Sequence, residues 1–246
     1  LSKSMDLSVY DSDNNSIIDA VVLVTTLKID QDSDYYWAYR YWNLYTDEEG
    51  YYYEYDNVSA NDYLWCSYQF LYEAEYGNYD DENAMNTYTF IHEFSHVLGA
   101  DDYYDYNDID NSPLEGYDMM DYMIGDHNAF TKFNYGWINN SRLVVAESNI
   151  TLNLESFTKS GDTIIIANNW DDTLGAYQEY YVLMYYTNDG LNSGKGGYFE
   201  NDGVVMYHIN SSLYKEVYGS DVYYDIYYNN STPNVGDYPG TTNNLI

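Results

Sequence analysis

The sequence predicts an α+β protein. Residues 1–140 are expected to combine a mixed sheet with one prominent helix, and residues 141–228 to form an all-β, sandwich-like module. An unbroken apolar run at residues 20–27 is typical of a buried strand, and residues 86–98 carry apolar side chains at helical spacing. Short alternating runs separated by turn residues then fill the second part. Residues 229–246, rich in Asn, Thr, Gly and Pro, are expected to be a tail or linker.

The helix expected over residues 86–98 carries the motif His92-Glu93-x-x-His96. Its two histidines lie one turn apart on the same face of the helix. Two imidazoles at this spacing can share one small cation, and zinc is the usual occupant. Glu93 lies about 100° round the helix from His92, beside the metal. Its carboxylate can therefore act as a general base towards water at such a site.

A third ligand is expected shortly after this helix. Gly99 follows His96 by three residues, at a good place for a turn that only glycine makes cheaply. The chain can then swing back and present Asp102 to the metal. Glu115 is the alternative third ligand, because it precedes the segment Asp118–Tyr122 and could swing under the metal.

Oxygen-bearing side chains stand at alternate positions in the loop before the run at residues 20–27. These residues are Asp11, Asp13, Asn15 and Asp19. The pattern resembles the first part of a calcium loop, although Ser16 stands where an EF-hand has glycine and no Glu closes the loop. The alternative is an acidic turn before a strand. Residues 101–111 are also acidic and are expected to be either a structural calcium site beside the zinc ligand or a solvated loop.

Two further segments have expected structures. Leu64 to Tyr76 alternate between apolar and polar positions, which favours a strand over residues 63–76, although a helix also fits part of it. In residues 117–138, Asn128 is expected to cap a short helix that Gly136 ends. The histidines outside the motif, His127 and His208, are expected to be structural, with His208 buried in a strand.

Composition excludes several partners. The chain has 41 acidic and 8 basic residues, a formal net charge of -33, and such a surface repels nucleic-acid phosphates and anionic membranes. No apolar run is long enough to span a membrane.

Cys66 is the single cysteine, so no intrachain disulfide exists. No signal peptide is visible, and we expect the chain to be a fragment of a longer precursor, with its N-terminal part truncated.

The motifs together resemble a known group of enzymes. The spacing H-E-x-x-H-x-x-G-x-x-D resembles that of the metzincin metallopeptidases, with Asp102 where their third His stands. Asp118-Met119-Met120-Asp121-Tyr122 resembles their Met-turn. Most specifically over residues 88–138, and more loosely over residues 10–210, the chain resembles the immune inhibitor A family of secreted bacterial zinc metallopeptidases.

The resemblance implies a metzincin-like zinc peptidase domain and a role for each site residue. His92, His96 and Asp102 (or Glu115) would hold Zn²⁺, and Glu93 would be the general base. Met120 would pack beneath the metal, with Met119 as the alternative if the turn is one residue out of register. Tyr122 would help to stabilise the oxyanion.

We therefore expect a secreted or cell-surface zinc endopeptidase that hydrolyses proteins or peptides, stabilised by Ca²⁺. Its precursor would carry a propeptide or further domains. The resemblance also implies that residues 63–76 form an edge strand that pairs with an extended substrate. The alternative is a non-catalytic, calcium-stabilised surface or binding module with a relic metal site. The intact Glu93 argues against that alternative, because a relic has no reason to keep the base.

Overall fold

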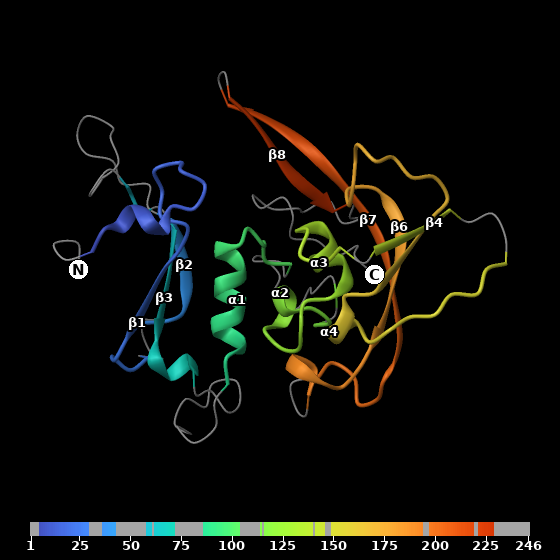
Figure 1. The fold of residues 1–246 in the computed structure, drawn as a ribbon, viewed down its shortest axis with the longest axis horizontal. Helices are drawn as coiled ribbons and strands as arrows, with labels where there is room; N and C mark the ends of the chain where they lie inside the picture. Colours follow the sequence, from blue (N-terminus) through green and yellow to red (C-terminus); the bar gives the residue numbers. More distant parts are fainter. Residues whose placement is uncertain are drawn as a thin grey trace. The chain divides into compact units, whose positions relative to one another are not determined.

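The computed structural model confirms an α+β protein with two mixed sheets (Figure 1). It describes residues 5–29, 36–42, 58–60, 62–71, 86–103, 114, 116–139, 141–145, 149–193, 197–218 and 221–228. The tail expected at residues 229–246 lies outside these ranges. Contacts divide the chain into two compact units, Leu1–Gly99 and Ala100–Ile246, whereas the sequence suggested a boundary at residue 140.

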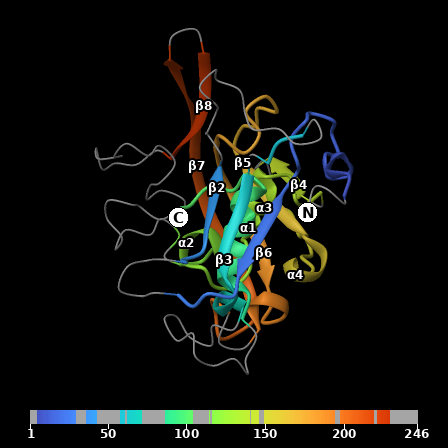
Figure 2. The ribbon, with the colours of Figure 1, turned by 90° about the vertical axis from the view of Figure 1, so that its left-hand side faces the viewer.

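The first unit contains a three-stranded sheet in the order β1-β3-β2, which faces the viewer in Figure 2. Its strands are β1 (Val21–Thr25), β2 (Tyr39–Trp42) and β3 (Asp62–Ser67). β3 pairs in parallel with β1 and antiparallel with β2. Short 3-10 helices at Leu7–Tyr10 and Tyr68–Leu71 precede β1 and follow β3.

The helix that carries the metal motif, α1 (Tyr88–Val97), packs against β2 and β3 of this sheet. Phe90 of α1 packs on a small core formed by Ala38, Cys66 and Phe70. The helix matches the expected residues 86–98 to within two residues at its start and one at its end. Leu98, which follows the helix, is 53% exposed. The helix is therefore fixed by the face that packs on the sheet, and exposure begins at Leu98, the residue after its last turn.

The prediction of a buried strand at residues 20–27 is only half correct. A strand forms there, but Val22, Leu23 and Val24 are 40%, 42% and 47% exposed. β1 lies at the edge of the sheet, with β3 on one side only. An apolar run thus indicates a strand without deciding whether both of its faces are covered.

The prediction for residues 63–76 is also only partly correct. β3 ends at Ser67, where the chain turns into the 3-10 helix Tyr68–Leu71. β3 is the central strand of its sheet, so the expectation of an edge strand is wrong. Both of its edges already pair with neighbouring strands, and an added peptide therefore has no place beside it. Residues 72–85 lie outside the described part of the chain.

The second unit contains a five-stranded sheet in the order β4-β5-β6-β7-β8. Its strands are β4 (Ser141–Val145), β5 (Thr163–Ala167), β6 (Glu179–Tyr186), β7 (Gly203–Tyr218) and β8 (Asp221–Tyr228). β4 and β5 are parallel, and the other neighbours are antiparallel. β7 and β8 form the long hairpin coloured orange-red in Figure 1.

Short helices accompany this sheet in the same unit. They are α2 (Met119–Tyr122), α3 (Ala129–Asn134), α4 (Phe157–Ser160) and the 3-10 helix Gly190–Asn192. α3 and α4 contact β6. Alternate β6 side chains, Tyr180, Val182, Met184 and Tyr186, are buried, whereas Val204 and Met206 of β7 are 61% and 59% exposed. One face of the sheet therefore packs against helices at β6, and the other face is open at Val204 and Met206 of β7.

This arrangement corrects the expectation of a sandwich-like module. Within the described residues, the strands of residues 141–228 form one sheet whose buried face meets helices. The apolar run at residues 150–154 is not a strand. Arg142 donates to the carbonyl oxygen of Asn153 at 2.6 Å, and the Glu155 N–H donates to Asp162 at 2.9 Å. These side-chain contacts take main-chain groups that a strand would use in a ladder.

Among the described helices, none combines the length and the apolar character that crossing a bilayer requires.

Candidate metal centre

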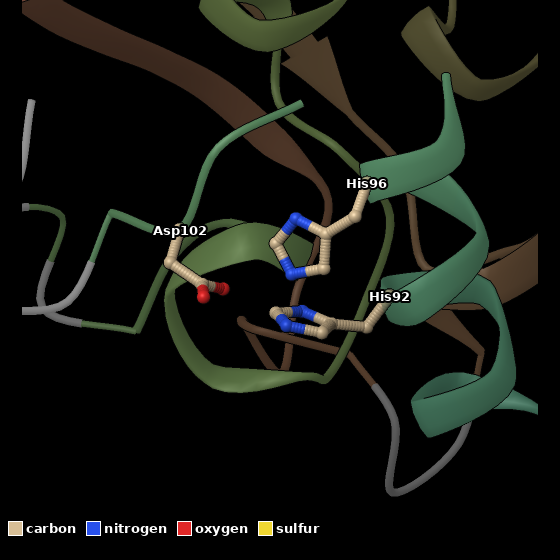
Figure 3. A group of neighbouring side chains, drawn as sticks. All are labelled: His92, His96 and Asp102. Carbon is tan, nitrogen blue, oxygen red and sulfur yellow. The ribbon is translucent and has the colours of Figure 1, made fainter. Parts of the chain in front are cut away.

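The three expected ligands come together. His92 and His96 lie on one face of α1, and Asp102 follows the helix after a turn at Gly99. One potential ligand atom from each of the three side chains lies within 4.8 Å of the others. Figure 3 shows the two imidazoles and the carboxylate directed towards a common centre. His92 and Asp102 are only 1% and 7% exposed, and His96 is half-buried.

This donor set suits a divalent metal. Two imidazoles and one carboxylate are ligands that zinc accepts in catalytic sites, where three protein groups leave a fourth position open. The His92 and His96 rings are T-shaped to each other, with centroids 4.8 Å apart and planes at 87°. The spacing of the two histidines by one helical turn produces this pairing, as the motif predicts. The residues present therefore fit a zinc ion.

Asp102 is held by main-chain contacts on both sides. Gly99 has a φ of +96°, a left-handed conformation that favours glycine, and its N–H donates to the His96 carbonyl at 3.0 Å. The Asp101 N–H donates to the Tyr135 hydroxyl at 3.1 Å. The Tyr103 N–H donates to the Met120 carbonyl at 3.0 Å. The turn predicted at Gly99 is thus confirmed.

Glu93, the expected base, is buried and held in place. It is 8% exposed, and its Oε2 accepts a hydrogen bond of 2.8 Å from the main-chain N–H of Arg40 on β2. Burial and, to a smaller extent, the negative charge of Glu93 raise the pKa of the Cys66 thiol to about 11. The Arg40 contact fixes the orientation of the carboxylate, because a hydrogen bond to one oxygen restrains rotation of the group.

The segment Asp118–Tyr122 forms the short helix α2 and its cap. Oδ1 of Asp118 accepts from the Met120 N–H at 2.7 Å. Met119 and Met120 are both fully buried, so either side chain satisfies the burial expected of a Met-turn, and the register of that turn stays a prediction. Tyr122 is 64% exposed; its role at the oxyanion also stays a prediction.

The rival ligand Glu115 lies outside the described residues. The same is true of most oxygen donors in the acidic stretch of residues 101–111, namely Asp105, Asn107, Asp108 and Asp110. Asp101, which is described, is exposed, and Asp102 points towards the two histidines.

The loop before β1 brings its carboxylates together as well. Carboxylate oxygens of Asp11, Asp13 and Asp19 lie within 4.8 Å of one another. Asp11 accepts from the N–H groups of Asn15 and Ser16 at 3.0 and 2.9 Å. Ser16 has a φ of +69°, so this serine takes the left-handed conformation for which an EF-hand uses glycine.

The other two histidines differ from each other. His127 is buried beside Asp126 and lies edge-on to Trp137, as a structural histidine should. His208 was expected to be buried, but its side chain is 35% exposed, with Nε2 3.1 Å from a Glu179 oxygen. The sheet face of β7 that carries His208 is the uncovered one, which explains the error.

Several contacts near the expected ligands have no recognisable signal in the sequence. Arg40 acts through its main-chain N–H, which carries no side-chain signal and comes from a strand far away in the sequence. Thr131 and Tyr103 contact each other through their hydroxyls although 28 residues separate them. A capping position for Asp118 was the only available signal, since an Asp before a short helix is a favoured N-cap.

Comparisons with protein-family models, with curated proteins and with solved structures found no match to this chain. The resemblance to the immune inhibitor A family therefore stays a prediction from the motifs.

The raised pKa of Cys66 predicts how this thiol reacts with iodoacetamide. Its pKa moves from 9.0 to about 11 in the folded protein. The thiolate is the nucleophile, and at pH 8 the thiolate fraction falls about tenfold for each unit by which the pKa rises. Labelling of the native protein at pH 8 should therefore be about 100-fold slower than labelling in urea. The folded protein keeps the thiol proton where the unfolded chain loses it, so this group's contribution to stability falls as the pH rises through that window. Labelling of the native protein at the rate seen in urea would contradict the raised pKa.

Proposed function

We propose that this protein is a zinc-dependent endopeptidase. One observation carries the proposal: His92, His96 and Asp102 offer ligand atoms within 4.8 Å of one another, and a buried carboxylate, Glu93, adjoins His92 on the same helix. Two imidazoles and a carboxylate leave a coordination position for water or substrate, which distinguishes a catalytic from a structural zinc site.

A zinc ion held there would supply Lewis acidity, polarising the scissile carbonyl and lowering the pKa of water. Glu93 would accept the proton as water attacks and deliver it to the leaving amine. The Arg40 N–H holds Glu93 through Oε2. Tyr122 is proposed to donate to the oxyanion, and Met120 to support the ligands from below.

The substrate is proposed to lie along β2. Its sheet has two edges among the described strands, β1 and β2, and an extended peptide can add to an exposed edge. β2 is the edge that contacts Glu93 through Arg40. Along an edge strand such as β2, alternate main-chain groups face away from the neighbouring strand, where an extended peptide can pair.

The resemblance to secreted bacterial peptidases supports an extracellular enzyme acting on proteins or peptides, made as a precursor with a propeptide or further domains. The net charge of -33 opposes binding to nucleic acid. Calcium is proposed as a second, structural metal at Asp11, Asp13 and Asp19, with Asn15 in the same loop. Three carboxylates so close repel one another unless a cation is bound.

The rival function is a non-catalytic, calcium-stabilised binding module. The burial of Glu93 and its hydrogen bond to the main chain favour the enzyme, because a buried charge needs a compensating partner to be kept. An assay of protein cleavage distinguishes the endopeptidase from the binding module.

The first prediction from this proposed function concerns Glu93, the proposed base. Glu93→Gln keeps an acceptor for the Arg40 N–H but removes the proton acceptor, so casein cleavage should fall by about 10²- to 10⁴-fold while zinc stays bound. Metal content by mass spectrometry and casein cleavage are measured on the same samples. Glu179→Gln, on an exposed glutamate of β6, is the matched control and should retain both properties.

The outcomes are distinct. A wild-type chain that binds no zinc would contradict the central proposal. Zinc binding without cleavage of casein or unstructured peptides would favour the binding module. His96→Ala should lose the metal together with the activity.

The second prediction identifies the third ligand. Asp102→Ala should weaken zinc binding by more than the 10- to 100-fold typical of residues outside the ligand sphere, because it removes one of three donors. Glu115→Ala and Asp101→Ala should bind zinc as the wild type does. Competition with a chromogenic chelator measures the affinities. A loss in Glu115→Ala with Asp102→Ala unaffected would assign the ligand to Glu115.

The third prediction tests calcium. At a free Ca²⁺ concentration 100 times its Kd, binding should stabilise the wild type by about 2.7 kcal/mol and raise its Tm. Asp13→Asn should lose most of this rise, whereas Glu200→Gln should keep it. Each substitution removes one negative charge, so an equal loss in both would indicate general screening instead of a site.

A further inference from the structure

The side chain of Asp118 is fully buried and accepts hydrogen bonds on both oxygens. Oδ1 accepts from the Met120 N–H at 2.7 Å. Oδ2 accepts from the Asn128 N–H and lies 2.7 Å from Oγ1 of Thr131. Burial raises the pKa of Asp118, whereas the hydrogen bonds to both of its oxygens favour the carboxylate form. Asp118 thereby joins the start of α2 to the start of α3.

The hydroxyl of Thr131 extends this network to Tyr103. Oγ1 of Thr131, which is fully buried, lies 3.1 Å from the Tyr103 hydroxyl oxygen as well as 2.7 Å from Asp118. A carboxylate only accepts and a threonine hydroxyl has one proton. The proton of Thr131 therefore goes to Asp118, and the Tyr103 hydroxyl donates to Thr131. The three side chains form a directional chain in which each bond strengthens the next.

Tyr103 is consequently fixed at two points. Its hydroxyl is held by Thr131 of α3, and its main-chain N–H donates to the Met120 carbonyl at 3.0 Å. It is fully buried, with its ring centroid 6.1 Å from that of Phe130. Asp102 is the residue immediately before Tyr103, so fixing Tyr103 also limits where the Asp102 carboxylate can point.

We propose that Asp118, acting through Thr131 and Tyr103, is the positioning residue for the third metal ligand, Asp102. This inference rests on the proposed zinc site. It deepens that proposal by assigning the placement of Asp102 to a buried network in the second unit. Asp118 is not itself a ligand, and its effect passes through hydrogen bonds to the residue next to the ligand.

The test uses a pair of matched substitutions at Thr131. Thr131→Val keeps the shape and removes the hydroxyl, whereas Thr131→Ser keeps the hydroxyl. We expect Thr131→Val to weaken zinc binding by about 10- to 100-fold, the size typical of partners that orient a ligand. Thr131→Ser should stay within about threefold of the wild type. Zinc affinity is measured by chelator competition at a temperature where circular dichroism shows both variants to be folded.

A second readout separates positioning from stability. Cobalt in place of zinc gives an absorption spectrum that reports ligand geometry, and it should change in Thr131→Val and not in Thr131→Ser. If Thr131→Val does not fold, Tyr103→Phe removes the other hydroxyl of the chain and keeps the ring. A lower Tm with unchanged zinc affinity and cobalt spectrum would overturn the proposal, because that is the result of a purely structural role.

Failure of this inference is distinguishable from failure of the proposed function. Wild-type protein that binds zinc but cleaves no protein would contradict the peptidase and leave the affinity comparison valid. Wild-type protein that binds no zinc would remove the site and this inference with it. Wild-type zinc affinity in Thr131→Val would overturn the positioning role alone.

Discussion

The buried carboxylate of Asp118 is the interaction on which the packing of α2 and α3 in the second unit depends. It lies where α2 and α3 begin and takes hydrogen bonds from both. A charged group without solvent is costly unless each oxygen is satisfied. That requirement makes the arrangement of Met120, Asn128 and Thr131 specific, because a shift of either helix would leave a buried oxygen unpaired.

The first unit also contains a buried carboxylate with a main-chain hydrogen-bond donor, at Glu93. The carboxylate of Glu93 lies on the buried face of α1, and the main chain of β2 supplies a hydrogen-bond donor to it. An edge strand presents N–H groups without a partner in the sheet, so one of them is available to the carboxylate. The same contact links the helix carrying both histidines to the strand beside which a peptide is proposed to bind.

In the second sheet, alternating apolar residues occur both on a strand that packs against helices and on a strand that exposes them. β6 buries every second side chain against α3 and α4, while β7 exposes Val204 and Met206 on the opposite face. Alternation in the sequence marks which residues share a face. It does not say whether a helix, another sheet or solvent meets that face, which is why a sandwich was expected and a single sheet with helices is found.

Local sequence determined the elements whose causes are local. The helix over His92–His96, the turn at Gly99, the cap at Asn128 and most strands of residues 141–228 follow from spacing, glycine and capping residues within a few positions. The convergence of Asp11, Asp13 and Asp19 was likewise readable from alternate positions in one loop. The spacing of the motif also led to Asp102 as the residue that meets the two histidines.

Tertiary structure alone decided the rest, because it depends on which distant segments meet. The central place of β3, the exposure of β1 and the half-exposed His208 follow from strand order and from what covers each face. The Arg40 N–H at Glu93 and the Tyr103–Thr131–Asp118 network join residues 53, 28 and 13 positions apart. A main-chain donor looks alike at every residue of a sequence, so only the fold shows which one reaches a buried carboxylate.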